Sequence, residues 1–309
     1  MKKSLIALAA LAAVSAASAQ SSVTLYGIAD IWVGKVKGGK VMAVSGGVNT
    51  SRWGVKGSED LGGGLKANFN LESGIDLGNG AVKGTLFDRQ ANVGVSGGFG
   101  TVKLGKSWNA LDDMFGAANS GFDSALSANG VWLNSYTGTA AAQLYYATPD
   151  MNGFNAAVST QLNGNSNNGA NKVSAFNLTY TAGPIYAGVG YENDKGTGQK
   201  GTMINGSYDL GKAKLLASVY NTKPTGAGVK VNSYQIGADV PLSSAMTLSV
   251  GYAASKPNGG QTNSAFGVAA AYSLSKRTTV YAGIRAESVK ASNGQPDRDV
   301  YAVGINHKF

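Results

Sequence analysis

The sequence predicts an all-β fold, a 16-stranded antiparallel transmembrane β-barrel with one long loop folded inward. Most of the chain consists of short segments in which apolar and polar residues alternate, as in strands with two different faces. Short turns alternate with longer polar loops between these segments, which is typical of outer-membrane barrels. No stretch beyond the N-terminus approaches the roughly 20 apolar residues of a spanning helix, so this chain would cross a membrane only as a barrel.

The N-terminus has the pattern of a secretory signal peptide. Two lysines precede an apolar run over residues 5–14, and residues 17–19 (Ala-Ser-Ala) match the small-residue pattern after which signal peptidase cleaves. We therefore expect residues 1–19 to be removed. Residues 20–309 are then expected to form one barrel domain in the cell outer membrane.

The composition argues against several functional classes. The chain has no cysteine and one histidine, His307, which excludes thiol catalysis and multi-histidine metal sites and leaves a histidine-based triad very unfavourable. The formal net charge falls from +9 to +7 without the two leader lysines. This charge fits either steering of anions or loop lysines solvated among lipid headgroups. We expect no enzyme activity, no cofactor, no metal and no nucleic-acid partner.

The first predicted strand covers residues 21–34, and residues 51–73 then carry the strongest strand signal in the chain. They form a hairpin around the turn Glu-Asp-Leu-Gly-Gly-Gly. In its first arm Arg52 and Lys56 lie opposite Trp53, and in its second arm Lys66 lies on a polar face. Alternation alone fits a soluble sandwich as well. In a membrane barrel, a charge facing lipid near the midplane would cost ~2 to 4 kcal/mol, so the polar face would line water.

Thirteen further strands are predicted along the rest of the chain. They cover residues 85–97, 100–107, 143–149, 153–163, 172–182, 185–194, 201–210, 213–223, 231–241, 246–255, 264–274, 278–289 and 300–309. With the first three strands the total is 16, an even number as bacterial single-chain barrels require. No fixed repeat period indicates a β-solenoid.

Residues 108–142 interrupt the strand pattern. They lack sustained alternation and are too long for an ordinary surface loop, so we expect a functional segment that enters the lumen and narrows a water-filled pore. An extracellular flap is the alternative. Asp112 and Asp113 lie early in this segment. A calcium site or a catalytic dyad is disfavoured, because adjacent residues of an extended chain point apart and no set of ligands follows.

The chain ends on a strand with Tyr301, His307 and Phe309 on one face. Together with the segments SSVTLYGIAD, SRWGVKGSEDLGGGLKANFNLES, LFDRQANVGVSGGFGTVKLGK and SLSKRTTVYAG, this ending resembles the trimeric general porins of Gram-negative outer membranes, most closely their basic, anion-preferring branch. The resemblance implies three barrels per assembly and a third extracellular loop that forms the constriction. Tyr301, His307 and Phe309 of the last strand are similar to the signal that barrel-assembly machinery recognises.

The resemblance also implies a constriction in which basic wall residues face acids on the loop. Arg52 and Arg89 match two basic wall positions, and Lys106 matches a basic position where the loop departs. Strict alternation would turn Arg89 outward with Val93 and Val95; we assign it inward, through a bulge or a subunit interface. The strand faces add Lys56 and Lys66 to the basic wall, and Asp112 and Asp113 supply the loop acids. Two departures are that residues 139–142 (Thr-Ala-Ala-Ala) replace a third arginine of relatives, and that their Pro-Glu-Phe turn is missing.

The resulting hypothesis is passive diffusion of ions and small hydrophilic solutes with weak to moderate anion preference. The expected partners are these solutes and anions, two further copies of the chain, outer-membrane lipids and lipopolysaccharide, and the barrel-assembly machinery. One alternative is a substrate-selective channel with an aromatic track of Trp108, Phe115, Phe122 and Trp132. The other is a surface or adhesion barrel that does not conduct.

Overall fold

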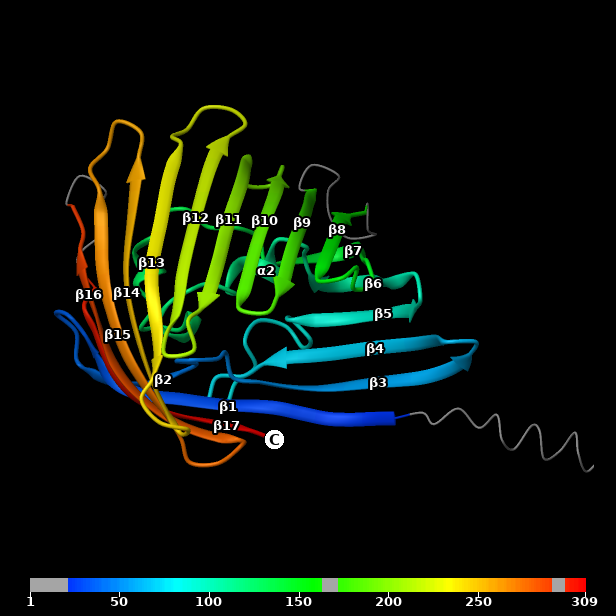
Figure 1. Cartoon of the computed structure of the whole chain (residues 1–309), viewed down its shortest axis with the longest axis horizontal. Coiled ribbons are helices and arrows are strands. Elements are labelled where there is room, and N and C mark those ends of the chain that lie inside the picture. The colour runs from blue at the N-terminus through cyan, green and yellow to red at the C-terminus, as the bar shows by residue number, and fades with distance from the viewer. Residues whose placement is uncertain (1–21, 163–171, 291–297) are drawn as a thin grey trace, which may run out of the picture.

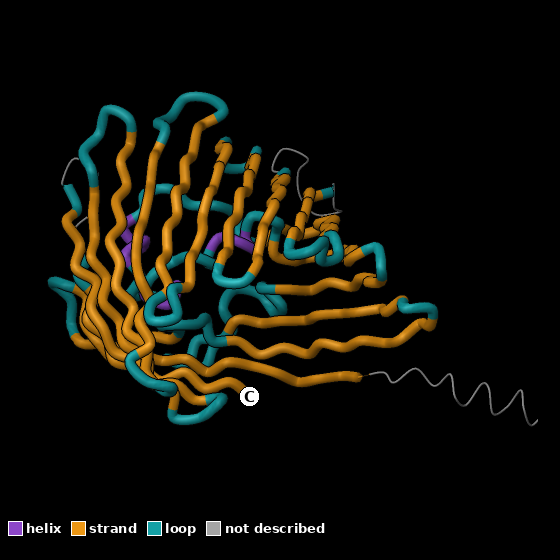
Figure 2. The backbone as a smooth tube through the Cα atoms, in the orientation of Figure 1, coloured by secondary structure: helices purple, strands orange, loops and turns teal. Residues whose placement is uncertain are grey.

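A computed structural model describes residues 22–162, 172–290 and 298–309, and more than half of them belong to one antiparallel sheet that closes on itself (Figures 1 and 2). The expected signal peptide lies outside the described residues. In the first half the strands are β1 (Ser22–Val36), β2 (Val41–Ser45), β3 (Arg52–Gly62), β4 (Leu65–Gly74), β5 (Gln90–Gly97), β6 (Gly100–Trp108), β7 (Thr139–Ala147) and β8 (Phe154–Gln161). In the second half they are β9 (Val173–Ala182), β10 (Ile185–Asp194), β11 (Gln199–Asp209), β12 (Lys214–Pro224), β13 (Val231–Pro241), β14 (Met246–Pro257), β15 (Asn263–Ser273), β16 (Thr278–Ser288) and β17 (Val300–Lys308).

Sixteen of these strands form the closed ring, which confirms the predicted fold class. The ring closes where β1 pairs with β17, and each other ring strand pairs with its neighbours along the chain. The additional strand β2 was not predicted. It pairs with residues 31–35 of β1, beyond Ile28, where the pairing of β1 with the start of β3 stops.

The C-terminal residue completes the seam between the first and last strands. Phe309 and Gly27 exchange two backbone hydrogen bonds of 3.0 and 3.1 Å. A Cβ at Gly27 would lie 2.2 Å from the Phe309 ring, so glycine makes room for that ring. His307 Nδ1 lies 2.9 Å from Thr278 Oγ1 of β16. Tyr301 pairs with Lys35 of β1, so all three residues of the expected assembly signal lie along the closing strand.

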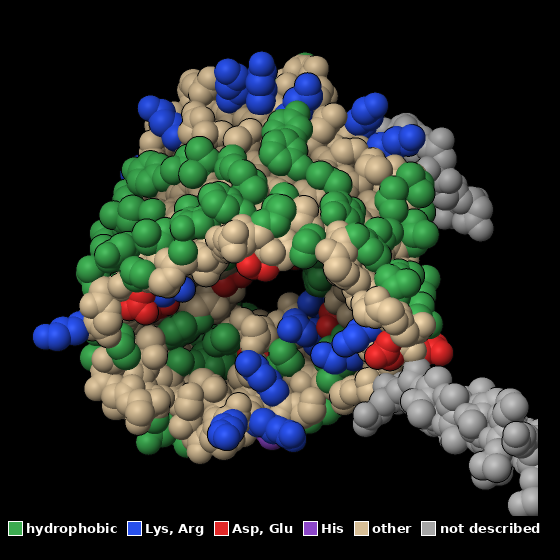
Figure 3. All heavy atoms as spheres, turned by 45° about the vertical axis from the view of Figure 1, so that its right-hand side comes forward, with side chains coloured by type: hydrophobic (Ala, Val, Ile, Leu, Met, Phe, Trp, Pro, Cys, Tyr) green, Lys and Arg blue, Asp and Glu red, His purple; other side chains and the backbone are tan. Residues whose placement is uncertain are grey.

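Large apolar side chains cover the outside of the barrel, and polar side chains are buried inside. Ile204 and Val219 are 59% and 42% exposed on the outer face, whereas Asn205 and Ser218 beside them are buried. This inversion of a soluble core is what a barrel with lipid outside and polar groups inside requires. Figure 3 shows the hydrophobic band on the wall and charged side chains within the opening. Among the described residues, no helix has the length and hydrophobicity to span a membrane.

The long segment after β6 folds into the ring, as predicted. Its residues 109–138 lie between the end of β6 and the start of β7. It contains three short helices, α2 (Asp112–Phe115), η1 (Gly121–Asp123) and η2 (Ala128–Val131). Figure 1 shows α2 behind β9 to β11, inside the barrel. Two strands begin four or more residues from their predicted starts. β7 begins four residues early, at Thr139, and β5 begins only at Gln90, because residues 85–89 form a turn in which Phe87 has a φ of 55°.

Candidate functional site

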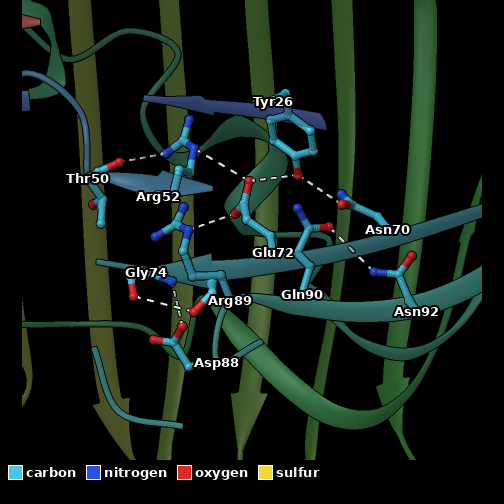
Figure 4. Close-up of polar contacts among 11 residues, drawn as sticks. Tyr26, Thr50, Arg52, Asn70, Glu72, Gly74, Asp88, Arg89, Gln90 and Asn92 are labelled. Atoms are coloured by element: carbon cyan, nitrogen blue, oxygen red, sulfur yellow. Dashed lines mark hydrogen bonds and ion pairs between the residues drawn. The ribbon is translucent and has the colours of Figure 1, made fainter. Parts of the chain in front are cut away.

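Two arginines from neighbouring parts of the wall meet at one buried carboxylate (Figure 4). Arg89 Nε lies 2.7 Å from Glu72 Oε1, and Arg52 Nε lies 3.5 Å from Glu72 Oε2. Glu72 is only 4% exposed, and the hydroxyl of Tyr26 donates a 3.0 Å hydrogen bond to Oε2. The carboxylate therefore holds both guanidinium groups on the lumenal side of the wall. Glu72 was not among the predicted site residues, although it lies on the charged face of the predicted hairpin.

Arg89 lies on this lumenal side for a reason other than those expected from the sequence. It comes directly before β5, so the alternation of Val93 and Val95 does not determine its direction. Its backbone N–H donates to the Glu72 carbonyl at 3.2 Å. The guanidinium carbon lies 4.8 Å from the Trp108 ring centroid, a distance at which a cation and an aromatic face attract. The turn before the strand is held by a 2.8 Å hydrogen bond from the Gly74 N–H to Asp88 Oδ1.

Lys56 and Lys66 share one face of the hairpin but lie at different heights along it. Lys56 shares the lumenal face of Arg52, and its Nζ lies 5.0 Å from the Tyr26 ring centroid. Lys66 has the same strand parity but lies beside the short turn, six residues from Glu72, or about 20 Å along the strand. The structure therefore does not bring Lys66 to the arginine pair.

For β6 the structure selects a different lysine from the predicted one. Lys106 pairs with Ala91, so alternation groups it with the exposed Leu104 and away from the lumen. Lys103 has the opposite parity, and its Nζ lies 3.8 Å from the ring centroid of Tyr145 on β7. The expected role of Lys106 in the wall is therefore replaced by Lys103. The alternation of Val102 and Leu104 was the sequence signal for this choice.

The two loop acids face tyrosines of the loop and wall. The hydroxyl of Tyr136 donates a 2.5 Å hydrogen bond to Asp112 Oδ1, and that of Tyr145 donates a 2.7 Å bond to Asp113 Oδ2. Burial raises the pKa of Asp112 to about 6, while the bond from Tyr136 acts in the opposite direction. These contacts attach α2 to its surroundings, so the acids both carry charge and fix the loop. Among the described residues, no group of acids and histidine is arranged to hold a metal.

The loop is fixed along its length by small polar side chains on the opposite inner wall. The Ala110 N–H donates to Ser159 Oγ at 3.0 Å, and the Gly121 N–H donates to Ser249 Oγ at 2.7 Å. In the other direction, polar side chains of the wall donate to loop carbonyl or amide oxygens: Asn205 to Met114 (2.6 Å), Gln235 to Asn119 (2.6 Å) and Arg285 to Ala125 (2.7 Å). None of these wall residues was predicted from the sequence. Their signal was a polar residue at every second strand position.

Glycines of the same wall make room for the loop. A Cβ at Gly251 would lie 1.9 Å from Ser120 Oγ, and one at Gly237 would lie 2.6 Å from Ser120 Cβ. A Cβ at Gly267 would lie 2.5 Å from the Leu126 carbonyl oxygen. We call Gly188, Gly190, Gly237, Gly251, Gly267 and Gly283 the glycine groove. Some of the 45 glycines of the chain thus serve close packing of the loop, in addition to turns.

The four aromatic residues of the proposed solute track do not form one ladder. Phe115 stacks on Tyr136 at 3.9 Å between centroids, and Trp132 stacks on Tyr220 at 6.3 Å. Trp108 lies under Arg89. Phe122 packs in a separate cluster with Trp32 and Leu126. These side chains mainly form small hydrophobic cores between the loop and the wall.

A buried acid on β1 fixes the first long loop. Asp30 is fully buried and accepts hydrogen bonds from the backbone N–H groups of Gly47, Val48 and Asn49 at 2.8 to 3.1 Å. It also accepts a 2.6 Å bond from the hydroxyl of Tyr281. The Gly47 carbonyl in turn accepts a 2.9 Å bond from Ala125 of the constriction loop. Asp30 therefore couples the two inward segments. No distinct pattern in the sequence marked this residue.

A closed barrel with an apolar exterior, a charged lumen and a loop folded across its waist defines a membrane channel of the porin type. Consistent with this class, the sequence model of the Gram-negative porin family matches residues 7–292. The chain belongs to that family. It is an outer-membrane protein through which small solutes diffuse passively.

Individual relatives agree along the whole chain. Outer membrane porin protein 32 of Delftia acidovorans is 32% identical, covering 99% of this chain and 95% of the relative. An outer membrane porin protein of Bordetella pertussis is 30% identical over the full length of both. Among solved structures, the anion-selective porin from Comamonas acidovorans matches with a TM-score of 0.83 and 26% identity, covering 94% of this chain and all of that one.

Proposed function

We propose that the pore prefers anions weakly to moderately. The observation that carries this proposal is the pair of lumenal arginines around one carboxylate. Arg52 and Arg89 share Glu72, so the cluster has one positive charge in excess, and Lys56 adds a second on the same face. Net positive charge at a narrow point raises the local concentration of anions. A relative with 26% identity is named as anion-selective, which supports the same assignment.

The preference is limited by the loop acids and by the absence of a third arginine. Asp112 and Asp113 lie on the loop side of the pore. Burial raises the pKa of Asp113, while the hydrogen bond from Tyr145 and the charge of Lys103 act in the opposite direction. At physiological ionic strength charges are screened over about 8 Å. Residues at the waist therefore influence passing ions more than Lys66 at the rim does. Transport is passive, and no chemical step is part of the proposal.

Three kinds of partner belong to the same proposal. We infer a homotrimer, in line with a distantly related outer membrane protein of Vibrio cholerae whose solved structure is described as a trimer form. The exposed apolar exterior would contact outer-membrane lipids, including lipopolysaccharide. The closing strand, with Tyr301, His307 and Phe309, would present the signal for barrel assembly after removal of residues 1–19.

Reversal potentials across planar bilayers under a potassium chloride gradient test the selectivity. The expected sign is that of chloride preference, and clear cation preference would refute the proposal. Current that a single solute class blocks at low concentration would instead favour the substrate-selective channel. Absence of conductance in reconstituted trimers would favour the surface barrel.

A further inference from the structure

Two lysines of the lumen lie over tyrosine rings and not against carboxylates. Lys56 Nζ lies 5.0 Å from the ring centroid of Tyr26, and Lys103 Nζ lies 3.8 Å from that of Tyr145. At both distances an ammonium group is attracted to the negative face of an aromatic ring. Among the ion pairs between described residues, none involves either lysine. An aromatic face therefore takes the place that an acid usually has beside a lysine.

The hydroxyl of each of these rings donates to a carboxylate. Tyr26 donates a 3.0 Å hydrogen bond to Glu72 Oε2, and Tyr145 donates a 2.7 Å bond to Asp113 Oδ2. A carboxylate acceptor polarises the hydroxyl and makes the ring face more negative, which strengthens its attraction for a cation. Both groups thus have the same order, with the ring between the ammonium group and the carboxylate.

The first group is built across three neighbouring strands. Tyr26 of β1, Gly54 of β3 and Glu72 of β4 lie directly opposite one another in the sheet. A Cβ at Gly54 would lie 2.8 Å from Cζ and from the hydroxyl oxygen of Tyr26. Glycine therefore lets the ring cross β3 and reach the carboxylate, as Figure 4 shows for Tyr26 and Glu72. Lys56 lies two residues beyond Gly54 on the same face of β3.

The second group is built from other strands and from the constriction loop. Lys103 of β6 and Tyr145 of β7 are direct cross-strand partners. A Cβ at Gly94 of β5 would lie 3.1 Å from Lys103 Cγ, so the glycine leaves room for the lysine stem. Asp113 comes from α2, and the Asn177 side chain of β9 donates a further 3.3 Å bond to its Oδ2. The same order of groups therefore occurs twice, on different elements of the chain.

The two lysines differ in this respect from the arginine nearest to them. Arg89 Nε contacts Glu72 Oε1 directly at 2.7 Å, so the carboxylate compensates its charge at close range. A pair of opposite charges in contact acts on a passing ion as a dipole, whose effect falls with distance faster than that of a single charge. A ring between the lysine and the acid prevents this contact. The ammonium group then acts on the pore with more of its charge.

We propose that Tyr26 and Tyr145 are positioning residues that keep Lys56 and Lys103 out of contact ion pairs with Glu72 and Asp113, and so maintain the positive potential of the pore. The inference rests on the proposed anion preference and names two residues that determine its strength. The ring of each tyrosine carries the effect. The hydroxyl contributes less, because it acts only through the ring and through the position of the acid.

The test compares Tyr145→Leu and Tyr145→Phe with wild type by reversal potentials in planar bilayers under a potassium chloride gradient. In Tyr145→Leu the ring is gone and Lys103 can reach Asp113. The ratio of chloride to potassium permeability should then fall by at least about twofold, as expected when one charge that acts through several ångströms of water is neutralised. Tyr145→Phe keeps the ring and should stay much closer to wild type. A ratio for Tyr145→Leu equal to that of wild type, or an equal fall in both variants, would overturn the proposal.

A second background separates lost positioning from a general disturbance of the loop. Asp113→Asn removes the acid that Lys103 would meet, so adding Tyr145→Leu to Asp113→Asn should leave the permeability ratio nearly unchanged. A merely structural role of the tyrosine would lower the ratio in both backgrounds, and that result would contradict the inference. The comparison uses the change in the ratio, so it holds whichever ion wild type prefers. Cation preference of wild type would refute the proposed function instead.

The matched control is Tyr186→Leu. Tyr186 lies on the lumenal face of β10, on the same side as Glu192, and none of the cation–ring contacts between described residues involves it. The control should keep the wild-type ratio, and a fall equal to that of Tyr145→Leu would overturn the proposal. Far-UV circular dichroism checks that each variant is folded. If Tyr145→Leu does not fold, Tyr26→Leu and Tyr26→Phe make the same comparison at Lys56, where equal ratios would again contradict the role of the ring.

Discussion

The wall of β1 to β6 and the wall of β9 to β16 both point every second side chain into the lumen, but they carry different residues there. On the first wall these positions hold long charged side chains such as Arg52 and Lys56. On the second they hold glycine, serine, asparagine and glutamine, for example Gly251 and Gln235. The constriction loop lies on the second wall. The same alternation thus lines the lumen with charged side chains on the wall of β1 to β6, and with small or polar residues that contact the loop on the wall of β9 to β16.

The largest effect is expected from filling the glycine groove. In Gly251→Val the new side chain would overlap Ser120, so the loop must move off the wall, and overpacking of this kind costs about 1 to 3 kcal/mol. Single-channel recordings should show altered and more variable conductance. Gly226→Val is the control, because a Cβ there meets no atom within 4 Å. Unchanged conductance in a folded Gly251 variant would show that the loop is not seated there.

The next largest effect is a change in ion selectivity when a charge on the wall of β1 to β6 is reversed. Arg52→Glu adds two negative units beside Glu72, which would leave two acids facing Arg89, so selectivity should shift strongly toward cations. Lys40→Glu makes the same charge change in an exposed part of the first loop and should shift it far less, because screening weakens distant charges. Reversal potentials measure both. Equal shifts would place Arg52 outside the constriction.

Neutralising the Glu72 carboxylate between the two arginines should change ion selectivity less than Arg52→Glu does, and in the opposite direction. Glu72→Gln removes its compensation of Arg52 and Arg89, so anion preference should rise while both guanidinium groups become less ordered. Glu59→Gln, near the short turn and exposed, controls for the loss of one acid. A lower anion preference in the Glu72 variant would mean that lost arginine positioning outweighs the gained charge.

The smallest effect is a dependence on pH. The pKa of Asp112 rises from 3.8 to about 6 on burial, so in the folded protein this carboxyl takes up a proton as pH falls through 6. The unfolded chain stays ionised to lower pH. Between these values the folded state binds more protons, so the contribution of Asp112 to stability rises as pH falls. Lowering the pH from 7 to 5 should also increase anion preference.

Asp112→Asn provides the check on this pH effect. It removes the titrating group but keeps an oxygen that accepts the hydrogen bond from Tyr136. Reversal potentials of the variant should therefore change less between pH 7 and pH 5 than those of wild type. The histidine of the chain, His307, lies at the seam near the rim, so His307→Gln should retain the wild-type change. An identical pH response in the Asp112 variant would assign the effect to another group.

The ring strands were predictable from the sequence because alternation over 8 to 15 residues is hard to produce without a two-faced sheet. It failed where backbone geometry departs from that rule. Alternation predicted a strand that includes residues 85–89, although Phe87 takes a positive φ. For the same reason, the predicted direction of the Arg89 side chain rested on an alternation that does not reach this residue. The five residues of β2 are too short to stand out within a loop.

The site was predictable only in part. Arg52 and Lys56 followed from alternation, whereas Lys106 followed from resemblance and conflicts with the faces of Val102 and Leu104. The wall residues that contact the loop were not predictable. Whether a lumenal glycine or serine contacts the loop depends on the path of a segment far away in the sequence. Polar residues such as Ser249 therefore looked like ordinary lumen lining.

Cysteine accessibility offers the most direct test of the difference between the two walls, because the natural chain has no cysteine. Lys56→Cys and Ser249→Cys each place one thiol on a lumenal position, the first exposed and the second fully buried under the loop. The structure predicts that a charged, water-soluble thiol reagent modifies Lys56→Cys rapidly with a stepwise change in current, and leaves Ser249→Cys unmodified. Equal reaction rates at both positions would contradict a loop seated on one wall and an open charged path along the other.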